Sequence, residues 1–488
     1  MANVTKIKVR MYRAGTGDFF LLRFMKGSKV SFKMMIDCGC IKAGKDTFTD
    51  MIKDLKTKTG GVIDLLVVTH EHADHINGFE KSSALLSQLT FKKVWFAWTE
   101  DDQDGVANDY RENRSELGIA VNAAVNRLNG LMKTKYYESL FANEVGGEFM
   151  LKGKERFIQS LNALNSLNPP TPLAATGTPL PTMLKQLMDL NIIKDRNSAD
   201  CLRPGETKTG LAGAEGIRFH ILGPPRNFKF LDRTESDGEN FEKREEKSKI
   251  DFAFLSALGA SRLKNDDAKL PFESTHEAKP TTHDHKIRTE YENGGDWRKI
   301  DHDWLYSAGS LAMRYERSIN NTSLVLAIQF EDSERVLLFP GDAEFGNWQS
   351  WHLNMEWPVI INGQVVNKNA EYLLNKTVFY KVGHHLSQNG TAKGKGIEMM
   401  TSGELTAMAT LDFKKINKGW LNTMPNDLLG AELIRKTKGK LYFVGDRAKI
   451  LSNINTHRVT VTKADEKILN DLNKKFDGKI YAECEIMG

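Results

Sequence analysis

Apolar runs of strand length recur through the first hundred residues. Residues 7–15 (IKVRMYRAG) and 19–25 (FFLLRFM) flank a Gly-Thr-Gly-Asp turn, which predicts a β-hairpin. Further strands are expected at residues 33–39, 64–70 and 91–98, and helical spacing of apolar positions predicts a helix over residues 76–89. The run at 64–70 (DLLVVTH) is continuously apolar, as is typical of a buried strand. The chain therefore begins as a β-rich α/β structure.

The pattern then changes twice. Residues 99–216 show helical spacing broken by a proline-rich stretch at 168–181, which predicts a helical insertion. A strand at 217–225 stops at a double proline. Residues 226–304 are mostly charged and polar with little periodicity, so we expect a second, lid-like insertion there.

Strand signals become dense again from residue 305 to 488. One helix is predicted among them at residues 425–439. The apolar runs that predict strands lie at residues 323–330, 335–342, 377–385, 406–413, 440–446, 457–463 and 479–486. One sandwich-like β core with helical layers, interrupted twice, explains this order better than separate domains do.

Composition adds mainly exclusions. The 488 residues include 40% hydrophobic and 27% charged residues, which is the profile of a globular protein and not of a disordered or collagen-like chain. A net charge of +5 permits a polyanionic substrate without requiring one. The four cysteines fit neither a metal-binding pair nor a disulfide framework, and no apolar stretch approaches the length of a membrane span. We therefore expect a cytoplasmic protein without a signal peptide.

The first cluster of candidate chemistry is THEHADHINGF, residues 69–79. It places His70, His72, Asp74 and His75 directly after a buried strand. Residues i and i+2 at a strand end point the same way, so His70 and His72 can chelate one metal while the next turn brings Asp74 and His75 towards a second. Neutral imidazoles and a carboxylate suit a borderline divalent ion.

Two more strand ends supply matching side chains. KVGHHLSQNG carries His384 and His385, and RVLLFPGDAE delivers Asp342 through a glycine turn. One carboxylate between two cations is typical of dinuclear hydrolytic sites. Three strand ends that deliver ligands to one edge therefore predict a site for two divalent ions.

With these motifs in view, the sequence resembles the metallo-β-lactamase superfamily, and more narrowly the hydrolase domain of competence DNA-uptake proteins of the ComEC type and its stand-alone relatives. The matching stretches are AGTGDFFLL, MIDCG, THEHADHINGF, LGPP, NNTSLVL, LLFPGDAE and KVGHHLS, between residues 14 and 387. The resemblance implies an αββα sandwich with the metals at one edge. Residues 1–98 and 305–488 would then be its two halves, with 217–225 as a core strand between the insertions.

The resemblance also implies a ligand set. His70, His72 and Asp342, aided by Asn320, would hold one ion, and Asp74, His75, Asp342 and His385 would hold the other. Many superfamily members have a histidine near position 320, and an amide oxygen there would favour a harder ion, so manganese competes with zinc. Leu386 stands where the family usually has glycine. The choice between His384 and His385 stays open, with the alignment favouring His385.

Other residues near this edge have expected roles. Asp37 is expected to orient a ligand histidine. Lys381, Ser387 and Asn389 are candidates to contact phosphate or the leaving oxygen, and Asp74 is expected to be essential for catalysis.

The leading functional hypothesis is a metal-dependent phosphodiesterase, a nuclease acting on DNA. The resemblance supplies the substrate, since the ligands alone imply only hydrolysis. A stand-alone nuclease of this kind could serve in defence against phage, with a regulatory protein partner. One alternative is hydrolysis of a small ester, thioester, lactone or cyclic nucleotide. Another is a partner-binding protein with structural metals, against which the intact ligand set argues.

Overall fold

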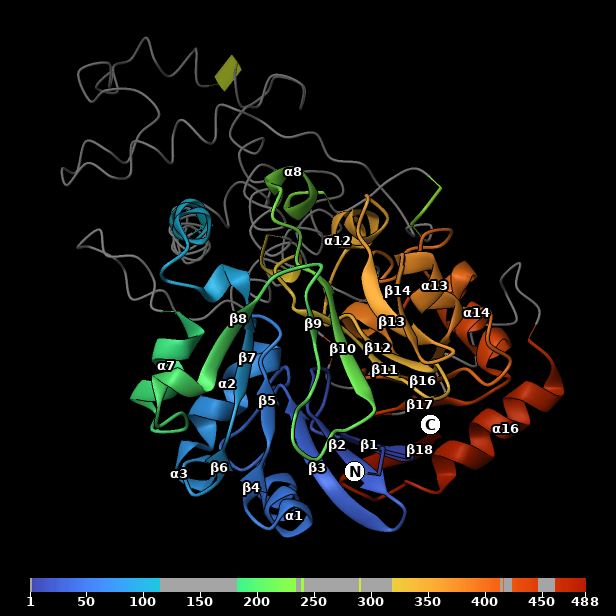
Figure 1. Cartoon of the computed structure of the whole chain (residues 1–488), viewed down its shortest axis with the longest axis horizontal. Coiled ribbons are helices and arrows are strands. Elements are labelled where there is room, and N and C mark those ends of the chain that lie inside the picture. Colours follow the sequence, from blue (N-terminus) through green and yellow to red (C-terminus); the bar gives the residue numbers. More distant parts are fainter. Residues whose placement is uncertain are drawn as a thin grey trace.

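The computed structural model describes residues 2–114, 182–233, 238–240, 289–290, 318–412, 416, 424–445 and 461–488. These residues form a mixed α/β structure built around two seven-stranded sheets (Figure 1). Most of the predicted helical insertion and most of the predicted lid lie outside the described residues. No helix in the described part of the chain combines the length and the apolarity that a membrane crossing requires.

The first sheet has the strand order β18-β1-β2-β3-β5-β7-β8. Strands β18, β1, β2 and β3 are antiparallel neighbours, whereas β3, β5, β7 and β8 run parallel. The strands are β1 (Lys6–Tyr12), β2 (Phe20–Lys26), β3 (Lys29–Ile36), β5 (Leu65–Val67), β7 (Val94–Ala97), β8 (Ala199–Leu202) and β18 (Tyr481–Met487).

The second sheet repeats this division, in the order β17-β16-β15-β12-β11-β10-β9. Here β12, β15, β16 and β17 are parallel, and β9 to β12 are antiparallel. The strands are β9 (Thr207–Lys208), β10 (Ile217–Gly223), β11 (Val325–Phe330), β12 (Val336–Phe339), β15 (Thr377–Lys381), β16 (Thr406–Ala409) and β17 (Leu441–Phe443).

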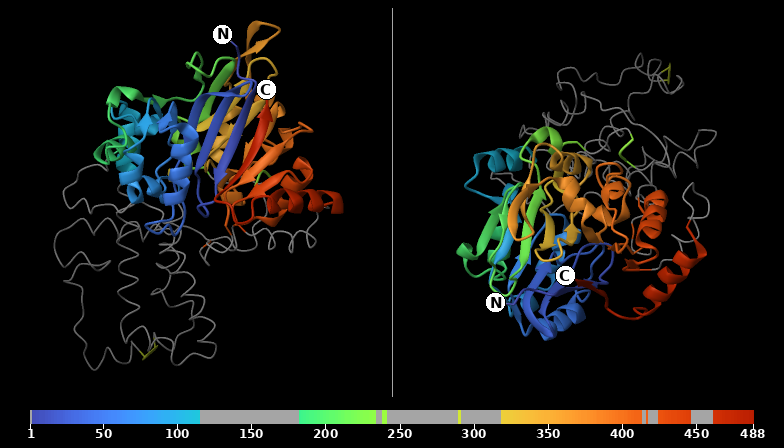
Figure 2. Two further views of the ribbon diagram at one scale, coloured as in Figure 1. Left: turned by 90° about the horizontal axis from the view of Figure 1, so that it is seen from below. Right: turned by 45° about the vertical axis from the view of Figure 1, so that its right-hand side comes forward.

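Helices cover the outer faces of both sheets (Figures 1 and 2). The first sheet packs against α1 (Thr49–Thr59), α2 (Ala73–Lys81), α3 (Ser83–Leu86) and α7 (Met183–Asp189). The second packs against α12 (Phe345–Trp351), α13 (Ala370–Asn375), α14 (Asp427–Thr437) and α16 (Lys463–Lys474). A short helix α8 (Phe228–Leu231) contacts α12. Small sheets are formed by β13 (Trp357–Ile361) with β14 (Gln364–Lys368) and by β4 (Val62–Ile63) with β6 (Thr90–Phe91).

The apolar runs of the central strands follow from this layering. In β5, Val67 faces the core between the two sheets while Leu66 faces the helices, and both are fully buried. A strand with both faces covered needs apolar residues at every position, so it lacks alternation. Aromatic rings join the sheets: Phe219 of β10 lies 5.4 Å from Trp95 and 6.1 Å from Phe24, between ring centroids.

The predicted helical insertion ends earlier than expected. The prediction of a helical insertion includes residues 199–202 and 207–208, but these residues form β8 and β9, which pair with β7 and β10. Only Leu202 of β8 is fully buried, because the strand lies at the sheet edge. A short edge strand with an aspartate and a cysteine gives little apolar signal, which explains the difference.

Candidate metal centre

The side chains of interest follow the carboxyl ends of parallel strands. His70 lies just beyond β5, Asp342 just beyond β12 and His385 just beyond β15. The carboxyl ends of parallel strands meet at one edge of a sheet, and this is where such folds place their ligands. The two sheets bring their edges together here, and all three residues are at most 1% exposed.

The first turn of α2 brings Asp74 and His75 into the same place. His72 has extended backbone at the helix start, so the chain turns sharply between the two histidines of the motif and the helix. The Asp74 carbonyl accepts a hydrogen bond of 3.0 Å from the Asp18 backbone N–H. A Cβ atom on Gly39 would lie 2.4 Å from that carbonyl oxygen, so only glycine permits this contact.

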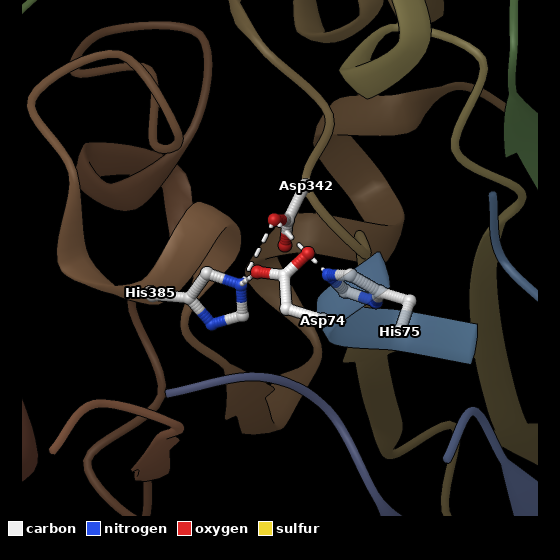
Figure 3. A group of neighbouring side chains, drawn as sticks. All are labelled: Asp74, His75, Asp342 and His385. Atoms are coloured by element: carbon white, nitrogen blue, oxygen red, sulfur yellow. Dashed lines mark ion pairs between the residues drawn. The ribbon is translucent and has the colours of Figure 1, made fainter. Parts of the chain in front are cut away.

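Asp74, His75, Asp342 and His385 form a compact cluster, the aspartate group. One ligand atom from each lies within 4.8 Å of the others, a geometry that can hold a metal ion. Nε2 of His75 is 3.1 Å from Oδ2 of Asp342, and Nε2 of His385 is 3.0 Å from the same oxygen. Figure 3 shows the two rings on opposite sides of the two carboxylates. His385 also lies 3.1 Å from Oδ2 of Asp74.

Charge balance within the aspartate group is visible in its pKa values. Burial alone would lower the pKa of His385, but the Asp342 and Asp74 carboxylates raise it to about 9. The pKa of His75 is likewise raised, against burial, by Asp342 and Asp18. Burial would raise the pKa of Asp74, yet the hydrogen bond from His385 lowers it to about 2. Without metal, protons on the imidazoles thus supply the positive charge that the carboxylates require.

Three further histidines, His70, His72 and His384, form the imidazole group beside it. Burial lowers the pKa of His72 to about 3 and that of His384 to about 4, and it moves the pKa of His70 well below its usual value. These rings are therefore neutral at physiological pH, which is the form that binds metals. Unlike the aspartate group, the ligand atoms of this set are not among the compact clusters of the described residues.

The nitrogens of His70 and His72 fit a shared cation. Nδ1 of His70 lies 3.1 Å from the Thr69 hydroxyl and 3.2 Å from that of Ser323. With the proton on this nitrogen, the Nε2 lone pair faces Nδ1 of His72 at 3.2 Å. Two such nitrogens side by side suit a divalent ion that both can bind.

Buried polar atoms without a hydrogen-bond partner also gather here. Among the described residues they include Nε2 of His72, Oδ1 of Asp74 and Oδ1 of Asn320. Unsatisfied buried polar atoms are costly, and a bound ion is one common explanation for them. The donor set therefore fits divalent metal ions.

A surrounding layer of side chains orients the candidate ligands. Oδ2 of Asp37 contacts Nδ1 of His75 at 2.8 Å and accepts a hydrogen bond of 2.6 Å from the Thr69 hydroxyl. Nδ1 of His385 lies 2.8 Å from the Thr410 hydroxyl, which donates to Asp18 at 2.7 Å. Asp37 was expected in such a role, whereas Thr69 and Thr410 were not singled out. Only the position of Thr69, beside the first histidine, was a visible signal.

The remaining predicted residues lie at different distances from the two groups. His384 and Asn320 are neighbours, with 3.5 Å between Nε2 and Nδ2, and Asn320 donates to Glu344 at 3.0 Å. Ser387 donates to Asn389 at 2.9 Å, and neither is in the compact cluster.

Lys381 is buried against Asp342 and Asp18, with its Nζ atom 3.1 Å and 2.7 Å from their carboxylate oxygens. Lys381 was predicted as a candidate to contact phosphate, but in the structure its ammonium group points inward, to protein acceptors.

The loop that carries the second histidine pair has unusual backbone. His384, His385 and Leu386 all have positive φ values, 42°, 47° and 68°. Consecutive left-handed residues other than glycine are rare and indicate strain that the surrounding structure must hold. Here the buried Leu386 side chain packs in the core beside α12 and α14, and its carbonyl accepts the Asn426 N–H at 2.8 Å. Packing thus replaces the glycine that the resemblance leads one to expect.

Comparison of the chain with known protein families, with curated proteins and with solved structures finds no match.

Proposed function

We propose that this chain is a metal-dependent phosphodiesterase with the αββα sandwich of the metallo-β-lactamase superfamily, and that it cleaves DNA. The observation that carries the proposal is the aspartate group, in which two strand ends and one helix start converge on a buried cluster of two carboxylates and two imidazoles. The imidazole group beside it offers neutral nitrogens for a second ion.

The residues have separate roles in this proposal. His70 and His72 hold one ion and Asp74, His75 and His385 hold the other, with Asp342 shared between them. His384 and Asn320 contact each other, and together they would complete the first ion position. When bound, two such cations lower the pKa of a bridging water and clamp the phosphate oxygens during in-line attack.

The substrate class rests on the sequence. The ligands imply hydrolysis, and the order of motifs from AGTGDFFLL to KVGHHLS, similar to that of the DNA-uptake hydrolase domain, favours DNA. Zinc and manganese both suit a site of imidazole and carboxylate ligands.

The full chain, stripped with chelator and reloaded with zinc or manganese, tests the proposal. We expect close to two ions per chain and metal-dependent cleavage of plasmid or single-stranded DNA. RNA, a chromogenic phosphodiester and a thioester serve as comparison substrates. Cleavage of the thioester alone would indicate a hydrolase of small substrates. Metal binding without hydrolysis of any substrate would contradict the proposal that the protein is an enzyme.

A further inference from the structure

Lys381 is the last residue of β15 and is almost wholly buried, with 1% of its side chain exposed. Its ammonium group lies 2.9 Å from the Gly341 carbonyl, 3.1 Å from Oδ1 of Asp342 and 2.7 Å from Oδ2 of Asp18. A lysine ammonium has three hydrogens to donate, and three acceptors surround this one. It therefore has no hydrogen left for a substrate.

The other oxygen of Asp342 has a different environment. Nε2 of His75 and Nε2 of His385 approach Oδ2 at 3.1 Å and 3.0 Å, from opposite sides of the carboxylate (Figure 3). Asp342 thus divides its two oxygens between two partners. Oδ1 faces a fixed cation of the protein, and Oδ2 faces the ring nitrogens of two candidate ligands, His75 and His385.

We propose that Lys381 is a positioning residue that keeps Oδ1 of Asp342 away from the metals, so that this carboxylate bridges both ions through Oδ2 alone. The inference rests on the proposed metal centre and adds how its shared ligand binds. A carboxylate that bridges through one atom brings two ions closer together than one that bridges through both oxygens. Lys381 therefore sets the spacing between the ions.

The same network extends to a second ligand. Asp18 contacts Lys381 through Oδ2 and accepts the Thr410 hydroxyl through Oδ1, and Thr410 contacts Nδ1 of His385. Asp342 and His385 are therefore oriented by one continuous chain of contacts. Because Asp18 comes from the turn before β2 and Thr410 from the end of β16, both sheets contribute to it.

Replacing the lysine by an apolar side chain of similar length tests the inference. The wild type, Lys381→Met and a control, Lys376→Met, are loaded with manganese. Lys376 immediately precedes β15, pairs with Glu334 at 2.6 Å and is 41% exposed, so it tests the same change outside the site. Ions per chain are counted by elemental analysis, and the metal–metal distance is measured by X-ray absorption.

We expect two ions per chain in all three proteins. The metal–metal distance should lengthen in Lys381→Met only, and phosphodiester cleavage by this variant should fall about 10- to 100-fold, as for other residues that orient metal ligands. A residue that only supports the fold would lower metal content or stability without changing the distance between bound ions. An unchanged distance in Lys381→Met would overturn the inference.

A crystal structure of the metal-loaded wild type provides a second test if Lys381→Met does not fold. Oδ1 of Asp342 should still contact Lys381 while Oδ2 binds both ions, and two oxygens on metal would overturn the inference. So would fewer than two ions in the wild type. Two ions without cleavage of any phosphodiester would instead contradict the proposed function, and the distance measurement would still decide the role of Lys381.

Discussion

The aspartate group and the imidazole group lie at the same sheet edge and are both buried, yet the pKa values of their histidines shift in opposite directions. Carboxylates hold the pKa of His385 at about 9, while burial lowers that of His72 to about 3 and that of His384 to about 4. The difference lies in the partners, since only the first group contains aspartates. Metal binding at the aspartate group must displace protons from His75 and His385. At the imidazole group the rings are neutral, so lone pairs on their nitrogens are already available to a metal.

The comparison depends most on Asp342, a member of the aspartate group that in our proposal is also a ligand of the ion at the imidazole group. Asp342→Asn should lose both ions and all detectable hydrolysis, because the amide cannot supply a negative oxygen to two cations. It also removes an anion beside the buried Lys381, so the free energy of unfolding should fall by about 3 to 5 kcal/mol. Elemental analysis and urea unfolding measure the two effects.

The exposed Asp50→Asn, 77% exposed in its side chain, is the control and should change neither quantity. Two ions retained by Asp342→Asn would mean that the two groups are independent sites.

Single-group variants should separate the two ions. Asp74→Asn removes a ligand of the aspartate group only, and His72→Gln removes one of the imidazole group only. Each should lower the content from two ions per chain to one, with hydrolysis lost in both cases because attack on phosphate needs the pair. Equilibrium dialysis counts the ions. If either variant lost both ions, binding would be cooperative and the separation into two groups would be wrong.

The pH dependence of metal binding should differ between these variants. His72→Gln keeps the aspartate group, where each proton that leaves His75 or His385 on binding raises the affinity about tenfold per pH unit between pH 7 and 9. Asp74→Asn keeps the imidazole group, whose rings are already neutral in this range and so have no second proton to release. Calorimetry in buffers of different ionisation enthalpy should show proton release for His72→Gln and a smaller release for Asp74→Asn.

The same shift affects the stability of the metal-free protein. The pKa of His385 rises from 6.5 in the unfolded chain to about 9 in the folded one. Its contribution is therefore complete below pH 6.5 and is lost as the pH rises through 9. In the calorimetry experiment, equal proton release from His72→Gln and Asp74→Asn would contradict the difference in protonation between the two groups.

The smallest effect is expected at Ser387, which belongs to neither group. Its hydroxyl donates to Asn389, so Ser387→Ala should cost about 1 kcal/mol of stability and leave metal content and cleavage rate unchanged. A large loss of rate with both ions bound would restore Ser387 as a contact for substrate.

The parts of this fold that sequence could predict are those in which apolar pattern and burial coincide. Central strands such as β5 and β12 are covered on both faces, so their apolar runs are unbroken. The predicted helix at 425–439 appears as α14, Asp427–Thr437, for the same reason of spacing. Helix α1 shows comparable spacing of Met51, Ile52 and Leu55 but was not recognised among its many lysines and threonines.

Other elements were obscured by weak or misleading patterns. The predicted strand at 457–463 lies largely outside the described residues, and its last residue, Lys463, begins α16. The hairpin of β13 and β14 was not predicted, since most of its residues are partly exposed.

At the site, sequence predicted which residue types meet but not how they share contacts. The histidines and aspartates could be named because they lie in short motifs that follow predicted strands, at spacings typical of metal ligands. The inward direction of Lys381 could not, since it depends on Asp18, a residue from the opposite sheet whose other partner, Thr410, is 392 positions away in the chain.

Those long separations also govern when the centre can form. His70 meets Ser323 across 253 residues, so no ligand cage exists in a partly folded chain that has not yet docked its two sheets. Short metal domains, by contrast, close their ligands within a few turns and fold around the ion. Here the metal should bind to a site that has already folded, so metal binding should follow folding as a separate, slower step. Removal of the metal should leave the protein folded.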